Sequence, residues 1–145
     1  MSRAKWLLCV VAMLPLAAAG CAAKGPTMSQ ALQRQGFVRS LPDTQEYARL
    51  LSNDDTIGMR SGLMVLQPGK DCGWHSTENY EELIICLDGA GELAGEGGPR
   101  CTFAAGQYAY NPPHTRHNVF NPGTAVMRYI YVVAPACAAD EDHEH

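Results

Sequence analysis

The sequence predicts an all-β domain, either a sandwich or a small barrel, and three observations support this prediction. Charged residues make up only 18% of the chain, whereas 14 glycines and 9 prolines interrupt it. From about residue 59 onward, short stretches rich in β-branched and aromatic residues alternate with turn-forming residues. A length of 145 residues is enough for one domain with one core. This profile suits many short strands better than a helical bundle.

The predicted strands follow one another between residues 58 and 135, and there are about eight or nine of them. Each one ends at glycine, proline or asparagine, the residues that favour turns. No internal repeat is visible. The stretches that carry the predicted strands are GLMVLQPG (62–69), YEELIICLDGAGEL (80–93), RCTFAAGQYAYNPP (100–113), HNVFNPG (117–123) and AVMRYIYVVAP (125–135).

A short helix is predicted before the strands, at residues 42–52. Ser40 and Asp43 have the spacing of a capping box, and one side of the helix that would follow carries Tyr47, Leu50 and Leu51. We expect this helix to cover one edge of the domain.

The first twenty residues have the layout of a secretory signal peptide. Arg3 and Lys5 precede an apolar run from residue 6 to 19, and small residues precede Cys21. The ending LAAAGC resembles the bacterial lipobox, although Ala18 stands where leucine is usual. A cleaved signal peptide without lipid is an alternative, and so is a retained transmembrane helix, for which the apolar run is short.

The lipobox resemblance implies a division of the chain. Residues 1–20 would be removed, Cys21 would carry the lipid, and residues 21–57 would hold the tether and the short helical segment. The protein would then be anchored to a membrane of the bacterial cell envelope and face the periplasm. By resemblance to known sorting signals, Ala22 favours the outer membrane because it is not aspartate.

The charge distribution argues against nucleic acid as a partner. The formal net charge is −4, and four acidic residues lie in the tail at residues 136–145, which is expected to be disordered. The folded part is therefore nearly neutral and offers no basic footprint for a phosphate backbone.

Four cysteines remain if the signal peptide is removed and Cys21 is lipidated: Cys72, Cys86, Cys101 and Cys137. Their spacing lacks the close pairs of a zinc ribbon. One or two disulfides are compatible with an exported protein, and a bond between Cys72 and Cys101 is one candidate. Cys86 is expected to be a buried thiol in the core.

The segment from Gly69 to Gly89 carries the first chemical motif. After Gly69 come five residues, His75, one residue, Thr77, four residues, Glu82, six residues and Gly89. This order resembles the first motif of the cupins, in which Thr77 stands at the position of a second histidine. On a regular strand, Glu82 would share the inward face with Ile84 and Cys86.

A second stretch resembles the second cupin motif. Gly106 is followed at the family's spacings by Pro112, His114, His117 and Asn121, with His114 in place of a glycine. The two motifs together span residues 69–121 and stand in the family's order. The resemblance implies a cupin-like jelly-roll β-barrel over residues 58–135.

The resemblance also implies a metal site. In the family, the motif histidines and the glutamate bind a divalent metal, and the matching positions are His75, Glu82 and His117. Two imidazoles and one carboxylate suit iron, nickel, manganese or zinc and leave coordination positions open. Thr77 is a poor ligand, so His114 could substitute, or the barrel could be free of metal and use these side chains to hydrogen-bond a ligand.

The sequence predicts the roles of the other polar and aromatic side chains less specifically. Arg116 and Arg128 could hold an anionic substrate, although solvated or ion-paired arginines are more usual. Tyrosines that alternate along two strands are expected in the core or the barrel wall. They are Tyr108, Tyr110, Tyr129 and Tyr131.

Three functions remain open on the sequence alone. The chain could be a metal-dependent enzyme of oxygenase or isomerase type acting on a small molecule. It could instead be a metal-free module that binds a small-molecule ligand, or a structural envelope protein with a vestigial pocket. Cupins often pair through their sheets, so the resemblance also implies a homodimer.

Overall fold

The computed structural model describes residues 35–136. The predicted signal peptide, the lipidation site at Cys21, and Cys137 with the tail that follows it lie outside the described residues. Within residues 35–136 the structure has eight strands and no α-helix. No helix among these residues is long and apolar enough to cross a membrane.

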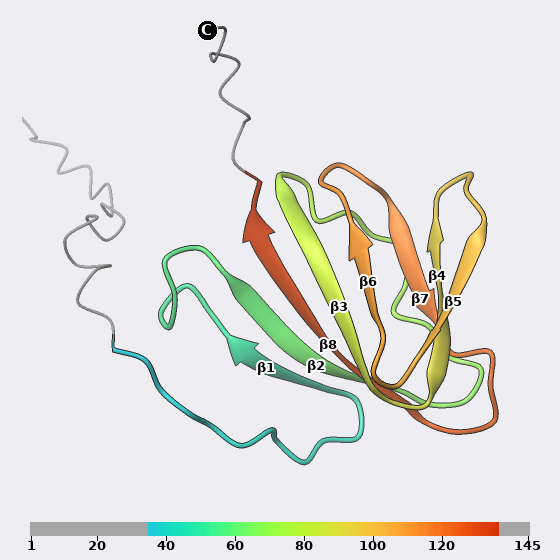
Figure 1. Cartoon of the computed structure of the whole chain (residues 1–145), viewed down its shortest axis with the longest axis horizontal. Coiled ribbons are helices and arrows are strands. Elements are labelled where there is room, and N and C mark those ends of the chain that lie inside the picture. Colours follow the sequence, from blue (N-terminus) through green and yellow to red (C-terminus); the bar gives the residue numbers. More distant parts are fainter. Residues whose placement is uncertain (1–34, 137–145) are drawn as a thin grey trace, which may run out of the picture.

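Five strands form the larger sheet, and all its neighbouring strands are antiparallel (Figure 1). Valine, isoleucine, leucine and tyrosine dominate these strands, as the pleated and half-buried surface of a sheet favours. In spatial order they are β1 (Tyr47–Leu51), β2 (Arg60–Leu66), β8 (Met127–Pro135), β3 (Tyr80–Asp88) and β6 (Tyr108–Asn111).

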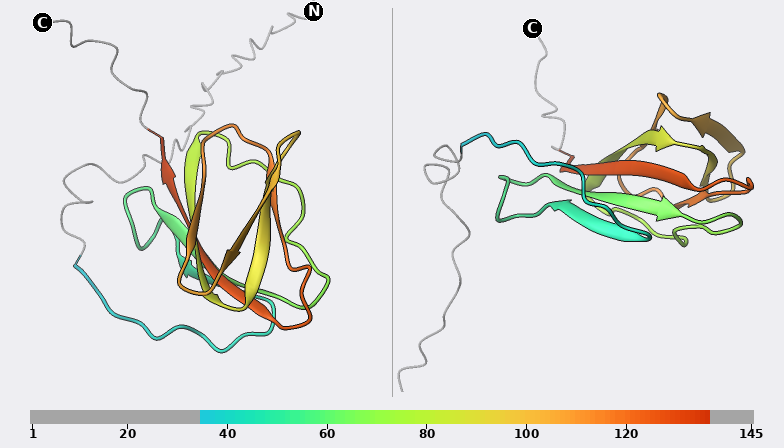
Figure 2. Two further views of the ribbon diagram at one scale, coloured as in Figure 1. Left: turned by 45° about the vertical axis from the view of Figure 1, so that its right-hand side comes forward. Right: turned by 90° about the horizontal axis from the view of Figure 1, so that it is seen from below.

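The smaller sheet lies against the larger one (Figure 2). It contains, in spatial order, β5 (Arg100–Ala104), β4 (Ala90–Gly95) and β7 (His117–Phe120). Residues 69–77 run along the free edge of β7 and act as an irregular fourth strand. The backbone N–H of His75 donates to the His117 carbonyl at 3.0 Å, and that of His117 returns the bond to His75 at 2.8 Å.

The core fills the space between the two sheets. On β3, Glu82, Ile84 and Cys86 are buried, whereas Leu83 and Ile85 are more than one-third exposed. This alternation confirms the inward face predicted for Glu82. The buried apolar cluster draws on both sheets and contains Leu66, Ile84, Cys86, Phe103, Val119, Met127 and Tyr129.

The helix predicted at residues 42–52 is wrong. Residues 35–46 have no regular structure, and the following residues form β1, whose Ala48 and Arg49 pair with Leu63 and Gly62 of β2. The helical pattern was local, whereas the backbone bonds that stabilise β1 come from a strand more than ten residues further along the chain. Tertiary pairing of this kind commonly overrides local propensity.

The cysteines and two of the tyrosines also depart in part from expectation. Cys72 and Cys101 are both free, so the candidate disulfide between them is not formed, while Cys86 is buried as predicted.

Tyr108 and Tyr110 are exposed, which contradicts their predicted place in the core or wall. They pair with Ile85 and Leu83 on the outward face of β3, so the same alternation that buries Glu82 turns them to solvent.

Candidate metal centre

Three side chains from separate parts of the sequence converge between the two sheets. His75 comes from residues 69–77, Glu82 from β3 and His117 from β7, and their ligand atoms lie within 4.8 Å of one another. Glu82 and His117 are buried, whereas His75 is exposed. Both sheets therefore contribute to a single cluster. The members of this cluster are the three residues that the cupin motifs imply.

Both histidine rings are held in the same way. Nδ1 of His75 lies 2.9 Å from the Gly73 carbonyl oxygen, and Nδ1 of His117 lies 2.9 Å from the Thr115 carbonyl oxygen. A carbonyl can only accept, so Nδ1 carries the proton in each ring and donates it. Histidines that ligate metals usually anchor their second nitrogen in this manner, which leaves Nε2 available.

The Nε2 atom of His117 is buried and has no hydrogen-bond partner among the described residues. It lies 2.7 Å from Oε2 of Glu82. The two atoms lie within ion-pair distance, but they form no hydrogen bond of acceptable geometry. Two electron-rich atoms at this separation repel unless a proton or a cation neutralises them. The donor set therefore fits a bound cation.

Asn111 orients the buried carboxylate. Its Nδ2 donates to Oε2 of Glu82 at 2.9 Å, and its side chain is 3% exposed. The two residues are direct neighbours in the pairing of β3 with β6. The sequence analysis did not single out Asn111, because only the strand register places it opposite Glu82.

The pKa of His75 is raised from 6.5 to about 9. A side-chain interaction with Cys72 contributes most; the Gly73 carbonyl and the nearby Glu82 carboxylate add to it, and partial burial of the ring opposes the rise. His75 is therefore protonated at neutral pH in the metal-free protein, and a metal would have to displace that proton.

The structure does not bring Thr77 or His114 into the ligand group. The Thr77 hydroxyl donates to the Tyr80 carbonyl at 2.7 Å, so this side chain shapes the cavity and fixes the start of β3. His114 is exposed in a loop with a positive φ of 58°, and it lies outside the cluster around His117.

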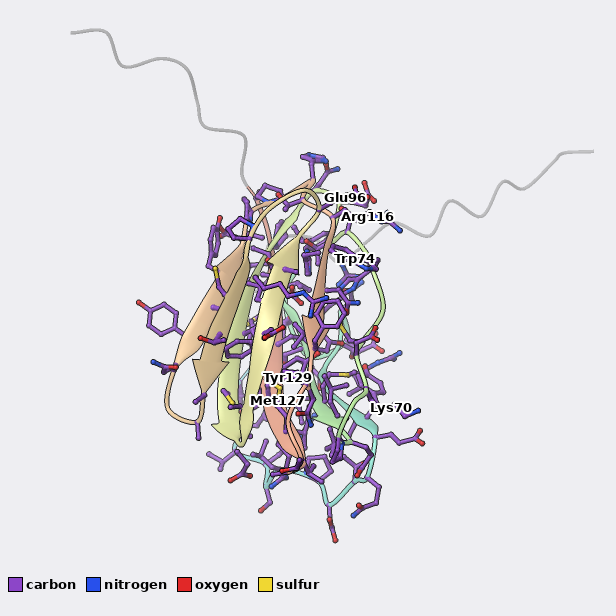
Figure 3. The ribbon with its side chains drawn as sticks, turned by 90° about the vertical axis from the view of Figure 1, so that its right-hand side faces the viewer. Lys70, Trp74, Glu96, Arg116, Met127 and Tyr129 are labelled. Atoms are coloured by element: carbon purple, nitrogen blue, oxygen red, sulfur yellow. The ribbon has the colours of Figure 1, made fainter. Side chains whose placement is uncertain are left out.

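A cavity of about 800 Å³ adjoins the cluster. His75 and Glu82 are among the residues that line it, and tyrosines form part of its wall. Burial raises the pKa of Tyr129 and of Tyr131, so both hydroxyls stay protonated at neutral pH. Tyr129 lies in the interior between the sheets (Figure 3).

Gly62 makes room for two of these tyrosines. A Cβ atom at this position would lie 2.7 Å from the Tyr131 ring and 2.8 Å from the Tyr47 ring. Because glycine has no Cβ atom, the two rings can pass over β2. The Tyr47 and Tyr131 hydroxyl oxygens then lie 3.2 Å apart. A glycine is therefore required here by the close approach of the rings, and it shapes the cavity.

The arginines that line the cavity differ from those expected. Arg116 pairs with Glu96 at 2.7 Å on the outside of the molecule, close to Trp74 (Figure 3). Arg128 pairs with Asp88 at 3.2 Å. Neither lines the cavity, whereas two other arginines do, Arg49 and Arg60. The sequence analysis missed both, because no motif surrounds them.

Comparison with known proteins supports this architecture. The sequence profile of the family described as "Cupin domain" matches residues 62–133. A Cupin 2 conserved barrel domain protein from Salinispora arenicola CNS-205 is 26% identical, with a TM-score of 0.58, over 70% of this chain and 91% of that chain. These two matches confirm the predicted jelly-roll barrel.

Two further solved structures are similar. A predicted oxalate decarboxylase from Thermotoga maritima is 25% identical, with a TM-score of 0.58, over 61% of this chain and 78% of that chain. Ectoine synthase from P. lautus is 22% identical, with a TM-score of 0.57, over 69% of this chain and 78% of that chain, and at this identity only the fold is shared. No curated protein sequence matches the chain.

Proposed function

Because residues 62–133 of this chain form a cupin domain, we propose that the protein binds a divalent metal ion through His75, Glu82 and His117 and acts on a small molecule held in the adjoining cavity. Two imidazoles and one carboxylate suit iron, nickel, manganese or zinc. A three-ligand set leaves coordination positions open for a substrate.

The unpaired Nε2 of buried His117 carries this proposal. A buried polar atom without a partner is costly, and here it faces a carboxylate oxygen at 2.7 Å. Without a metal, the two atoms repel each other unless the ring carries a second proton. A cation would satisfy both atoms, and the Nδ1 contacts with backbone carbonyls already turn each Nε2 to the available side.

The chemistry follows from the residues around the cluster. When bound, the metal would supply a Lewis acid that polarises an oxygen of the substrate. Asn111 keeps the Glu82 carboxylate in position, and Thr115 and Gly73 keep the two rings in position. Tyr129 and Tyr131, which remain protonated, offer hydroxyl groups to a ligand in the cavity. The similarity to a predicted oxalate decarboxylase supports an enzymatic role on a small molecule.

Metal content tests the proposal directly. The protein is purified without chelator or histidine tag, and its metal is measured by mass spectrometry beside the His117→Ala variant. We expect near-stoichiometric metal in the parent protein and almost none in the variant, because one of three ligands is lost.

The matched control is His114→Asn, which changes an exposed histidine three residues from His117. Asparagine tolerates the positive φ at this position. This variant should retain its metal. Absence of metal from the parent protein, even after reconstitution with iron, nickel, manganese and zinc, would overturn the proposal and favour a metal-free binding barrel.

We also propose that the protein is anchored by lipid at Cys21 in the bacterial cell envelope, on the strength of the signal-like residues 1–20 and the LAAAGC ending. Partitioning into detergent that disappears in Cys21→Ser supports the anchor. A processed protein that stays in the aqueous phase would contradict it.

A further inference from the structure

The arginines of the folded domain fall into two groups. Of the six in the described residues, four form ion pairs with carboxylates: Arg39, Arg100, Arg116 and Arg128. The other two, Arg49 and Arg60, line the cavity, and among residues 35–136 no carboxylate lies within ion-pair distance of either. The arginines without an ion-pair partner are therefore the two at the cavity.

Arg60 shares a row of the sheet with the metal-ligand glutamate. In the strand register, Arg60 pairs with Val133, and Val133 pairs with Glu82. Two strand spacings separate the arginine from the glutamate, about 10 Å between Cα atoms. All three residues line the cavity, so Arg60 and Glu82 lie on the same wall of it, two strands apart.

Each arginine is held beside a tyrosine. The Arg60 guanidinium lies 4.2 Å from the centre of the Tyr80 ring, which supports its orientation without neutralising its charge. Arg49 lies one row further along, opposite Gly62, next to the Tyr47 and Tyr131 hydroxyl pair. Burial raises the pKa of Tyr131, and the positive charge of Arg49 opposes that rise.

The charge balance of the cavity favours an anion once a metal is present. Three carboxylates line it, from Asp54, Glu78 and Glu82. A divalent cation together with Arg49 and Arg60 outweighs them. An occupant that carries negative charge at both ends would meet positive charge at the metal end and at the arginine end.

We propose that the cavity binds a small organic dianion, with one carboxylate directed to the three-ligand site and the other held by Arg60 and Arg49. Arginine suits this role because its planar fork of donors matches a carboxylate. This inference rests on the proposed metal-dependent function and names the substrate class of the same site. The arginines are specificity-determining groups and take no part in holding the metal.

The test is isothermal titration of the metal-loaded protein with straight-chain dicarboxylates from malonate to pimelate. One length should bind best, because the gap between the two ends is fixed. The neutral diamide of that acid should bind at least tenfold more weakly. The Arg60→Gln and Arg49→Gln variants should each lose roughly tenfold or more in affinity for the diacid.

Arg116→Gln is the matched control, since it removes an exposed arginine away from the cavity, and it should bind the diacid like the parent protein. Equal affinity for the diacid and its diamide, or unchanged affinity in the Arg49→Gln/Arg60→Gln double variant, would overturn the inference. So would failure of the whole series to bind.

Metal content, measured on the same samples, separates the two proposals. Normal metal without diacid binding overturns the substrate class and leaves the metal site intact. Arginine-dependent diacid binding by a protein that takes up no metal supports the anion site and overturns the metal-dependent function.

Discussion

Asn111 orients the Glu82 carboxylate by a hydrogen bond and is not itself one of the three proposed metal ligands. Its replacement therefore tests how much the orientation of a ligand contributes to the site. In the Asn111→Ala variant, the buried carboxylate of Glu82 loses the amide donor that the described residues provide. We expect the free energy of unfolding of the metal-free protein to fall by about 1–3 kcal/mol. Metal affinity should fall roughly 10–100-fold, as for other groups that orient a ligand. Urea unfolding and metal titration measure the two effects.

The control for this change is Asn79→Ala, at an exposed position just before β3. It should leave both stability and metal affinity within error of the parent protein. If Asn111→Ala behaves like this control, the hydrogen bond to Glu82 does not position the carboxylate.

The raised pKa of His75 predicts a pH dependence with a definite sign. The folded-state pKa of about 9 lies above the unfolded value of 6.5, so the protonated ring stabilises the metal-free fold below pH 6.5. That stability is lost as the pH rises toward 9. Metal binding must release the same proton, so apparent affinity should rise about tenfold per pH unit from pH 7 toward 9.

Calorimetric titration in buffers of different ionisation enthalpy counts the protons released. One proton from His75 is expected at pH 7.5, and the count should drop toward zero above pH 9. A count of zero at pH 7.5 would show that His75 is already neutral there.

At the scale of elements, residues 69–77 determine where His75 lies. Oδ1 of Asp71 accepts hydrogen bonds from the Gly73 backbone N–H at 2.8 Å and from the Asn118 side chain at 2.9 Å. These bonds, led by the one from Asn118, lower the pKa of Asp71. One carboxylate thus closes the turn before His75 and ties this segment to β7.

Asp71→Ala should therefore loosen the irregular strand without unfolding the barrel. Amide hydrogen exchange at Cys72 and His75 should become several-fold faster, because both amides donate to β7. Metal affinity should fall roughly tenfold. Lys70→Ala, at the preceding exposed position, serves as control, and equal exchange in both variants would remove the proposed role of Asp71.

At the scale of the whole molecule, the proposed metal site joins the two sheets. Glu82 belongs to the larger sheet, whereas His117 belongs to the smaller one. A ligand at one hundred times its dissociation constant stabilises the fold by about 2.7 kcal/mol. For a domain of this size, that corresponds to a rise on the order of 10 °C in the midpoint of unfolding.

Thermal melts with and without chelator measure this shift, and His117→Ala should show none. A parent protein whose midpoint does not respond to added metal or to chelator would contradict a site that joins the sheets.

The sequence predicts those features of the molecule that depend on a short motif or on a regular alternation of residue types. The resemblance to the two cupin motifs identified His75, Glu82 and His117, and alternation identified the inward face of β3. The helix at residues 42–52 failed because β1 is stabilised by its pairing with β2. The roles of Asn111, Arg49 and Arg60 depend on strand register, and Arg116 is neutralised by Glu96, twenty positions earlier. Pairings of this kind are not visible in a linear pattern.

The edge position of β1 has a consequence for how such a protein can diversify. β1 pairs with β2 alone, yet it supplies Tyr47 and Arg49 to the cavity. The three side chains of the proposed metal site all come from other elements. Mutations in β1 can thus change which molecule is accepted without altering the reactive centre, so a library randomised at Tyr47, Arg49 and Leu51 offers a direct route to new ligand preferences on an unchanged scaffold.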